Sequence, residues 1–251
     1  MGEGAAAVAK LEAYDKGLSY SYAPGLFPAT ECLNNAPERC LRLLLHSQSE
    51  KSEGARRLRE AAASAGVRCE TADRALSRIS GKDNCFAAMV YEKREGVFDG
   101  ASPHIVLVNP SDSGNLGTIL RTALGFGFVN VAIIRPAVDS DDPRVTRASM
   151  GAAFSLNVRH FDSFERYREE FPSRQLFPFM LTASLPLAEA VRQVNGPYAL
   201  VFGNEASGLP DSFSLLGIPT RIPHSGKIDS LNLAIAAGIG MCAFAATGIE
   251  R

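Results

Sequence analysis

Apolar and polar positions alternate along the first ninety residues in blocks that predict strands separated by helices. We expect strands at 41–47, 67–73 and 85–93 and helices at 52–66 and 75–80. Strand, helix and strand in succession are typical of a small α/β domain. The first seventeen residues contain several alanines but no basic segment followed by a long apolar run, so they predict a loose tail and not a signal peptide.

From residue 104 onward the alternation is clearer, and the strand candidates are almost continuously apolar. We expect strands at 104–108, 130–135, 155–160, 177–183, 197–203 and 218–222, and helices at 114–125, 143–150, 163–171, 186–193 and 230–247. Such strands are typical of a parallel sheet that is covered by helices on both faces. The predicted organisation is a tail (1–17), a small α/β domain (18–92), a linker (93–103) and a larger α/β domain (104–251).

Composition restricts the class of protein without identifying its function. Hydrophobic residues make up 46% and charged residues 21% of the 251 positions, which is typical of a folded cytoplasmic protein. The five cysteines are an odd number without a C-x-x-C pair, which argues against a disulfide framework and against a zinc site, so we expect no metal. A net charge of −1 counts against a generic nucleic-acid binder but permits local basic patches. No apolar run is long enough to predict a membrane span.

Three polar segments follow predicted strands, at the carboxyl ends where ligand sites of α/β proteins usually lie. The first, NPSDSGNLGTILRTALGFGF (109–128), turns the chain and opens a helix, with Ser113 as the expected N-cap. The second, YALVFGNEASGLP (198–210), places Glu205 just beyond a buried strand. Each of them alone also fits an ordinary capped helix or a tight turn.

The third segment is IPTRIPHSGKIDSLNLAIAAGIGMCAFAA (218–246), in which a glycine-containing loop leads into a long helix. Ser230 is the expected N-cap of that helix, and Asn232 lies in its first turn. The helix is rich in small apolar residues, so we expect it to be fully buried and Asn232 to lie near an enclosed polar site.

Together and in order, the three segments resemble the motifs of the SpoU (TrmH) family of RNA 2′-O-ribose methyltransferases, within the SPOUT superfamily. SGNLGTILRTA resembles the family's N-x-G-N-[IL]-G-x-I-x-R-T-A run, GNEASGL resembles G-x-E-x-x-G-[LM], and IPHSGKIDSLNLAIA resembles I-P-M-x-G-x-x-x-S-L-N-V-S-V-A. The resemblance covers roughly residues 103 to 249. More loosely, YAPGLFPATECLNN resembles the start of the small RNA-binding domain that often precedes the catalytic domain.

This resemblance implies an α/β fold with a C-terminal trefoil knot that binds S-adenosylmethionine, and a homodimer formed through the knotted domain. The implied reaction is methyl transfer to a ribose 2′-hydroxyl of rRNA or tRNA. The residues that match the family's cofactor site are Gly203, Ile222 and Leu231, with Thr182 as a further candidate. The residues that match its catalytic site are Arg121, Asn115, Glu205, Ser230 and Asn232.

Arg121 matches the family's catalytic arginine. Because arginine has too high a pKa to be a good general base, we expect it to position the ribose and phosphate and to assist removal of the 2′-hydroxyl proton electrostatically. Two positions depart from the family pattern: His224 replaces the usual Met, and Ala234 replaces a common second Ser. Ala234 weakens any claim that a hydroxyl is required at this position, and His224 is either a change to the cofactor pocket or a tolerated variant.

Two groups of arginines are candidate RNA contacts. Arg56, Arg57 and Arg59 cluster on one predicted helix of the first domain, while Arg144 and Arg147 are expected near a loop beside the site in the second. An ordinary solvated helix surface explains the first group equally well.

Other functions fit less well or stay open. An NAD-dependent oxidoreductase would need a G-x-G-x-x-G turn after a strand, which the chain lacks. A base-methylating SPOUT enzyme and a non-catalytic RNA-binding relative both remain alternatives. Nothing in the sequence selects the RNA or the nucleotide, or indicates whether the modification confers antibiotic resistance.

Overall fold

The computed structural model describes residues 11–80 and 85–245, and the chain forms two compact units. The first unit contains the residues up to 94 together with 139–155, and the second contains 95–138 and the residues from 156 onward. Segment 139–155 thus leaves the second unit and packs within the first. The sequence predicted one boundary between two continuous domains, and such a boundary does not account for segment 139–155. Hydrophobic periodicity indicates where helices and strands lie, but it does not indicate which sheet they pack against.

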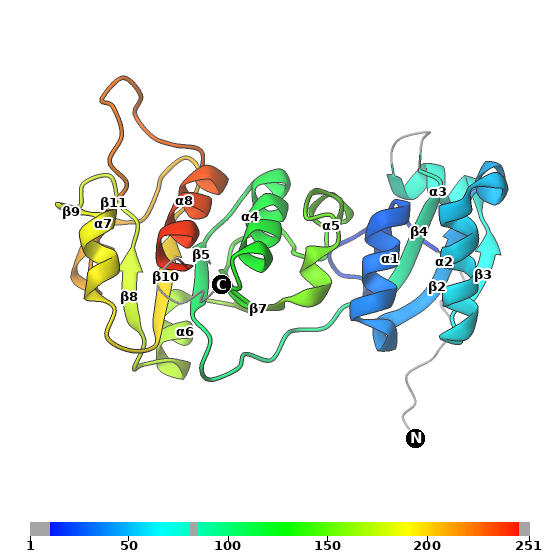
Figure 1. The fold of residues 1–251 in the computed structure, drawn as a ribbon, viewed down its shortest axis with the longest axis horizontal. Coiled ribbons are helices and arrows are strands. Elements are labelled where there is room, and N and C mark those ends of the chain that lie inside the picture. Colours follow the sequence, from blue (N-terminus) through cyan, green and yellow to red (C-terminus); the bar gives the residue numbers. More distant parts are fainter. Residues whose placement is uncertain (1–10, 81–84, 246–251) are drawn as a thin grey trace. The chain divides into compact units, whose positions relative to one another are not determined.

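The first unit is built on a four-stranded sheet of order β1-β4-β2-β3, in which β4 is antiparallel to β1 and β2 while β2 and β3 are parallel (Figure 1). Its strands are β1 (Tyr20–Pro24), β2 (Cys40–Leu45), β3 (Arg68–Thr71) and β4 (Ala87–Glu92). Its helices are α1 (Leu26–Asn35), α2 (Glu53–Ser64), α3 (Asp73–Ser80) and α5 (Pro143–Ala148), with 3-10 turns at Pro37–Arg39, Ser47–Lys51 and Ala152–Ser155. Helices α1 and α2 pack on one face of the sheet, and α3 packs on the other.

Polar contacts tie segment 139–155 to the rest of the first unit. Asp139 accepts hydrogen bonds from the Tyr14 hydroxyl at 2.6 Å and from the Lys93 ammonium at 2.9 Å. Asp141 forms an ion pair with Arg39 at 3.3 Å. Burial of Asp139 opposes its ionisation, but the bonds from Tyr14 and Lys93 outweigh this and lower its pKa. The segment is therefore held by ionic contacts as well as by packing.

The second unit is built on a five-stranded parallel sheet of order β7-β6-β5-β10-β8, with a separate pair β11-β9. The strands are β5 (His104–Val108), β6 (Asn130–Ile134), β7 (Asn157–Phe161), β8 (Gln175–Pro178), β9 (Leu185–Pro186), β10 (Tyr198–Phe202) and β11 (Thr220–Arg221). The helices are α4 (Ser113–Gly125), α6 (Phe164–Glu170), α7 (Leu187–Ala190) and α8 (Leu233–Ala245), with 3-10 turns at Val191–Gln193 and Asp211–Leu215. The α/β class and the parallel sheet are confirmed.

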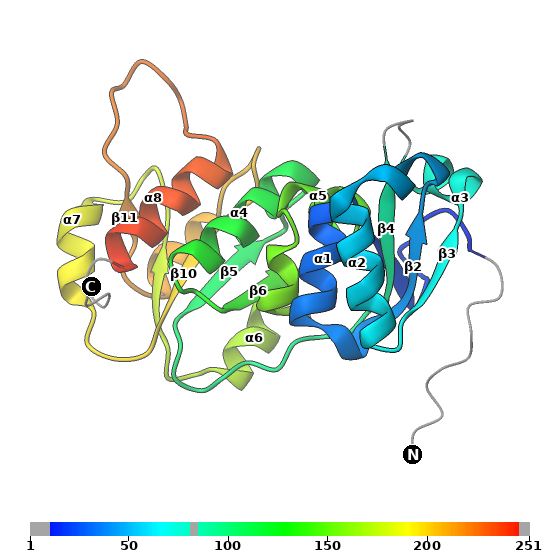
Figure 2. The ribbon, with the colours of Figure 1, turned by 45° about the vertical axis from the view of Figure 1, so that its right-hand side comes forward.

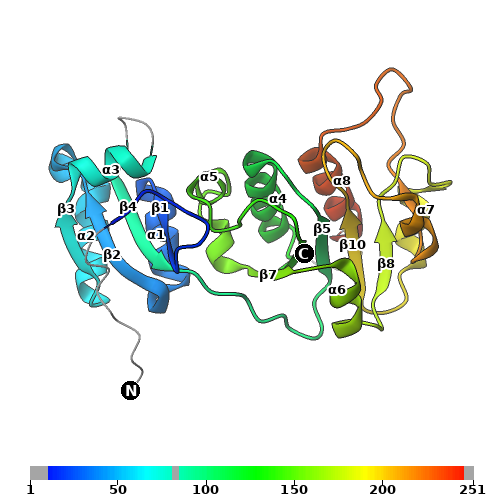
Figure 3. The ribbon, with the colours of Figure 1, turned by 180° about the vertical axis from the view of Figure 1, so that it is seen from behind.

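Helices cover both faces of this sheet, as the apolar strands predict (Figures 2 and 3). One face packs on α6 and on the turn that contains Phe213. On the other side α4 and α8 pack against each other, and Phe244 of α8 contacts Phe177 of β8 with ring centroids 4.8 Å apart. The strand expected at 218–222 within the parallel sheet is present only as the two residues of β11. These residues pair with β9 and are not part of the five-stranded sheet.

Helix α8 is not fully buried, contrary to the expectation from its composition. Ile235 and Ile239 are 55% and 38% exposed, while Ala237 and Met241 are buried. A helix that is apolar on all sides gives no periodic signal that separates its inner from its outer face.

Gly240 lets α8 approach the aromatic rings behind it. A Cβ atom at this position would lie 2.7 Å from Phe179 and 3.1 Å from Phe202, two rings stacked with centroids 4.4 Å apart. We expect Gly240→Ala to lower the free energy of unfolding by about 1–2 kcal/mol, because overpacking outweighs the gain in helix propensity. Gly238→Ala is the matched control, since its Cβ would meet only the Thr122 methyl at an ordinary 3.6 Å. Equal stability of the two variants in urea unfolding would contradict this.

Candidate active site

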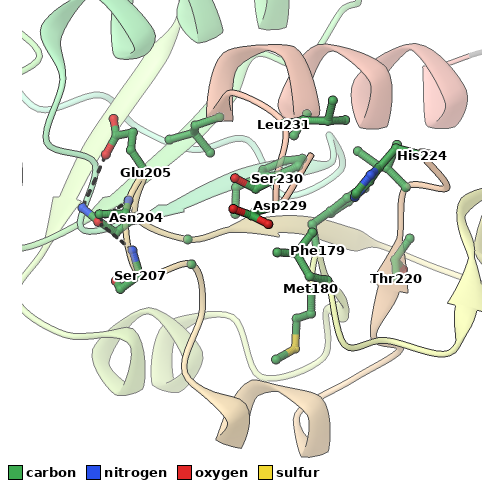
Figure 4. Close-up of a pocket in the computed structure, with 18 residues that line it drawn as sticks. Phe179, Met180, Asn204, Glu205, Ser207, Thr220, His224, Asp229, Ser230 and Leu231 are labelled. Atoms are coloured by element: carbon green, nitrogen blue, oxygen red, sulfur yellow. Dashed lines mark hydrogen bonds between the residues drawn. The ribbon is translucent and has the colours of Figure 1, made fainter. Parts of the chain in front are cut away.

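A cavity of about 300 Å³ lies at the carboxyl end of β10 in the second unit (Figure 4). Three segments form most of its wall: the end of β8 with the turn after it, the loop after β10, and the loop that leads into α8. Figure 4 shows the side chains of Phe179, His224 and Asp229 around this space. The wall is mainly apolar with a few polar groups, which is typical of a small-molecule site.

The structure brings most of the expected cofactor residues to this cavity. Gly203, Ile222 and Leu231 line it, together with Glu205 and Ser230 of the expected catalytic set; Thr182 is exposed and is not among the lining residues. Strand β8 ends at Pro178, earlier than expected, so the chain has already turned when it reaches residue 182. The cavity is instead lined by the residues just before it, Phe179, Met180 and Leu181.

Glu205 connects the loop after β10 with the start of α4. Its carboxylate accepts hydrogen bonds from the Ser111 amide at 3.0 Å, the Ser111 hydroxyl at 2.8 Å, the Asp112 amide at 3.1 Å and the Asn115 side-chain amide at 3.3 Å. Partial burial opposes ionisation of Glu205, but the hydrogen bonds from Ser111 and Asp112 outweigh it and lower the pKa of the carboxyl. Glu205 is therefore an ionised acceptor that holds the first and second motif segments together.

A second link extends this network to the third segment. Asn232 donates from its side-chain amide to the side-chain oxygen of Asn115 at 3.0 Å. The oxygen of Asn232 accepts from the backbone amides of Ala234 and Ile235, at 2.9 and 3.3 Å. Glu205, Asn115 and Asn232 thus form one continuous chain of hydrogen bonds across the three segments that the sequence singled out.

The two expected N-caps are wrong by one and two positions. The N-cap of α4 is Asp112, whose carboxylate accepts from the Asn115 amide at 2.7 Å, and Ser113 is the first helical residue. Asn232 performs the same role for α8, and Ser230 lies before it in the cavity wall. Serine, aspartate and asparagine are all good caps, so neighbouring candidates cannot be separated by residue type.

The glycines of the second segment are required by a tight loop. Asn204 and Gly208 exchange backbone hydrogen bonds of 3.2 and 2.9 Å, and a Cβ on Gly203 would lie 2.2 Å from the carbonyl carbon of Gly208. Gly208 itself has a positive φ of 66°, which favours glycine. This folding of the loop places the Glu205 side chain toward Ser111 and Asn115.

Arg121 lies outside this network. It is exposed on α4, six residues beyond Asn115 and hence about 9 Å farther along the helix axis. It does not line the cavity, and in the described part of the chain it forms no ion pair. Its neighbour Thr122 faces Gly238 of α8.

The arginines expected to contact RNA all lie in the first unit. Arg56 and Arg57 of α2 form ion pairs with Glu53 at 2.9 Å each, and Arg56 also pairs with Glu60 at 2.6 Å. On α5, Arg144 pairs with Asp142 at 2.6 Å. Of the five expected RNA contacts, Arg59 and Arg147 take part in none of these ion pairs; Arg59 is exposed and Arg147 is half-buried. Helix α5, which carries Arg144 and Arg147, belongs to the first unit, whereas the cavity lies in the second.

Several cavity residues were not predicted from the sequence. They include Phe179, Met180, Ser207 and Asp229. Asp229 directly precedes Ser230 in the third segment and was the one available signal, a carboxylate between a glycine loop and a helix start.

In residues 11–80 and 85–245, no three His, Cys, Asp or Glu side chains are grouped so as to hold a metal ion. In the same residues, every helix is too short or insufficiently apolar to span a bilayer.

Comparison with known proteins identifies a family that most of the second unit matches. Residues 102–242 match the model of the SpoU rRNA Methylase family. An uncharacterized tRNA/rRNA methyltransferase of Synechocystis is 34% identical over 141 residues, which cover 54% of this chain and 50% of that protein. The 23S rRNA (guanosine-2′-O-)-methyltransferase RlmB of Xylella fastidiosa is 30% identical over 136 residues, covering 54% and 55%. The chain thus spans about half the length of these curated relatives.

Solved structures match over a longer range. The crystal structure of the SpoU methyltransferase AviRb from Streptomyces viridochromogenes superimposes with a TM-score of 0.79 at 20% identity, over 91% of this chain and 90% of that one. The AdoMet-bound rRNA methyltransferase of Sinorhizobium meliloti gives a TM-score of 0.76 at 23% identity, over 92% and 89%. At this identity the likeness concerns the fold, and it includes both units.

Proposed function

This chain belongs to the SpoU rRNA methylase family, and on that basis we propose that it transfers a methyl group from S-adenosylmethionine to a ribose 2′-hydroxyl of rRNA or tRNA. One structural observation supports the proposal in addition to membership of the family. The second and third motif segments line one cavity, and Asn115 of the first segment is hydrogen-bonded to Glu205 and Asn232 of the other two. The relatives named 2′-O-methyltransferases support this choice over base methylation.

The cavity suits the proposed cofactor. Its volume of about 300 Å³ is at the lower end of the range for ligand pockets. Phe179, Leu231 and Ile222 offer apolar surface for an adenine ring. Loop residues 203–208 and the carboxylate of Asp229 offer polar groups for the ribose and amino-acid parts of the cofactor.

When bound, S-adenosylmethionine supplies a methyl group that is already activated by its sulfonium. The remaining task of the chain is to align the ribose oxygen with that group and to exclude water. The hydrogen-bond chain from Glu205 to Asn232 fixes the loops that border the cavity. We assign to Arg121 the positioning of a phosphate and electrostatic help in removing the hydroxyl proton, because a planar guanidinium can hold phosphate oxygens by two hydrogen bonds.

Among the described residues no arginine lines the cavity, and a homodimer would supply one. The exposed Ile235 and Ile239 on α8 form an apolar strip, and Ile239 follows Gly238, which faces Thr122 beside Arg121. A second copy packed on this strip would lie next to Arg121. We therefore propose that the second units pair through α8. The trefoil knot that the family resemblance implies, like the dimer, remains a prediction.

Charged substitutions on the strip are expected to separate the dimer. Ile235→Asp combined with Ile239→Asp places two desolvated charges in the interface, so we expect a shift from dimer to monomer in sedimentation and a large loss of methyl transfer. Leu215→Asp is the control, because Leu215 is 87% exposed on the same unit but away from α8. A double variant that stays dimeric would contradict the proposed interface.

The function as a whole is tested by transfer of labelled methyl groups from S-adenosylmethionine to RNA, followed by identification of the product nucleoside. A 2′-O-methylated nucleoside is the expected product, and we expect the reaction to take place in the cytoplasm. A methylated base would identify the alternative SPOUT chemistry. Cofactor binding without any transfer to RNA would instead favour a non-catalytic relative.

A further inference from the structure

We propose that Phe27 and Phe86, at one end of the sheet of the first unit, form a stacking platform for unpaired nucleobases of the RNA substrate. This inference rests on the proposed function and assigns a substrate contact within it. Phe27 is 52% and Phe86 39% exposed, whereas most large apolar side chains of this unit are buried. Among the described residues of this unit, Phe27 and Phe86 are the aromatic members of the exposed large apolar side chains.

Backbone contacts place the two rings on the same end of the sheet. The Gly25 amide, two residues before Phe27, donates to the Ala87 carbonyl at 2.7 Å, and Ala87 directly follows Phe86. The His46 amide donates to the Phe86 carbonyl at 3.0 Å. The His46 ring lies edge-on to Phe86 with centroids 5.8 Å apart. The platform is thus made where β1 and β2 end and β4 begins.

Groups that favour a phosphate backbone lie beside these rings. The first turn of α1 has no side-chain cap and no acidic residue, so its free amides and its dipole present a positive end next to Phe27. Arg147 of α5 approaches the Cys85 thiol, next to Phe86: burial raises the pKa of Cys85, and the charge of Arg147 partly offsets that rise. Unlike Arg56, Arg57 and Arg144, Arg147 takes part in no ion pair formed by described residues.

This combination fits unpaired RNA better than a protein partner. Flat aromatic rings stack on any exposed base, and nearby positive groups follow the phosphates, which is how single-stranded nucleic acid is commonly bound. Sequence-specific RNA recognition also favours loops and bulges whose bases can be splayed out. The ion-paired arginines of α2, by contrast, present a nearly neutral surface, so we expect them to contribute little.

The test uses the full chain and a twelve-nucleotide single-stranded RNA that contains one 2-aminopurine. We expect the wild-type chain to quench the 2-aminopurine, and Phe27→Ala and Phe86→Ala each to weaken binding by about tenfold. Phe27→Tyr and Phe86→Tyr should restore affinity, because the ring is retained. The same RNA annealed to its complement should bind more weakly and be indifferent to the substitutions. Leu215→Ala, an exposed apolar residue of the second unit, is the matched control.

Calorimetric binding of S-adenosylmethionine by each variant separates this inference from the proposed function. Unchanged cofactor binding with weakened RNA binding supports the platform. No quenching by the wild-type chain, or an alanine double variant that binds the single strand as tightly as wild type, would overturn the platform while leaving methyl transfer intact. Failure of the wild-type chain to bind S-adenosylmethionine would instead count against the proposed function.

Discussion

Arg121→Ala is expected to lower the rate of methyl transfer by about 10²–10³-fold while leaving the affinity for S-adenosylmethionine unchanged. Arg121 does not line the cavity and takes no part in the hydrogen-bond chain of Glu205, so its removal should not disturb the cofactor site. Its guanidinium is the one side chain of the first motif that can hold a phosphate by two hydrogen bonds and support charge on the ribose oxygen.

Two further variants make this prediction specific. Arg121→Lys keeps the charge but loses the planar fork, so we expect intermediate activity. Arg192→Ala removes another exposed arginine of the same unit and should leave activity unchanged. Single-turnover rates at saturating cofactor, together with calorimetric cofactor affinity, check the result. Full activity of Arg121→Ala would remove Arg121 from the mechanism.

Glu205→Gln is expected to reduce both stability and turnover. The substituted amide places a donor where five donors now converge, from Ser111, Asp112, Asn115 and Asn204, so at least one of them loses its partner. We expect a loss of about 1–2 kcal/mol in the free energy of unfolding. Turnover should fall about 10²-fold, because the start of α4 and the loop after β10 are then no longer held in register. Glu189→Gln, a solvent-exposed carboxylate on α7, is the control.

The pH dependence of unfolding gives an independent check on Glu205. The hydrogen bonds hold the pKa of its carboxyl below the ordinary value in the folded chain. The stability that it contributes is therefore fully present above the unfolded pKa of about 4.3 and is lost as the pH falls through the lower folded value. The difference in unfolding free energy between wild type and Glu205→Gln should be constant near pH 7 and shrink below about pH 4. A difference that persists at low pH would show that Glu205 is not held as an ionised acceptor.

The sequence predicted the second unit well because its strands are continuously apolar and its motifs lie at strand ends. Glu205 and Asn115 were both expected in the catalytic site, and their side chains are hydrogen-bonded at 3.3 Å. Strand β1 and helix α1 were not predicted, since the short YSYAP run and a helix that begins with Leu, Phe and Pro have weak local preferences. Tertiary packing against β4 decides both elements.

Three other features were not predicted, two of them because they depend on more than local pattern. The exchange of segment 139–155 into the first unit depends on contacts of Asp139 and Asp141 with residues distant in sequence. The neutralisation of Arg56 and Arg57 by Glu53 follows from i,i+3 and i,i+4 spacing and could have been anticipated. The cavity wall at Phe179 and Met180 depends on where β8 ends, and strand ends are the least certain feature of any sequence-based assignment.

The central claim is tested most directly by incubating the full chain with RNA and S-adenosylmethionine labelled in its methyl group, then digesting the RNA to nucleosides. The proposed function predicts label on a single kind of 2′-O-methylated nucleoside, absent from the Arg121→Ala reaction. Label on a base, or no label on RNA although the chain binds S-adenosylmethionine, would contradict the assignment of this chain as a ribose methyltransferase.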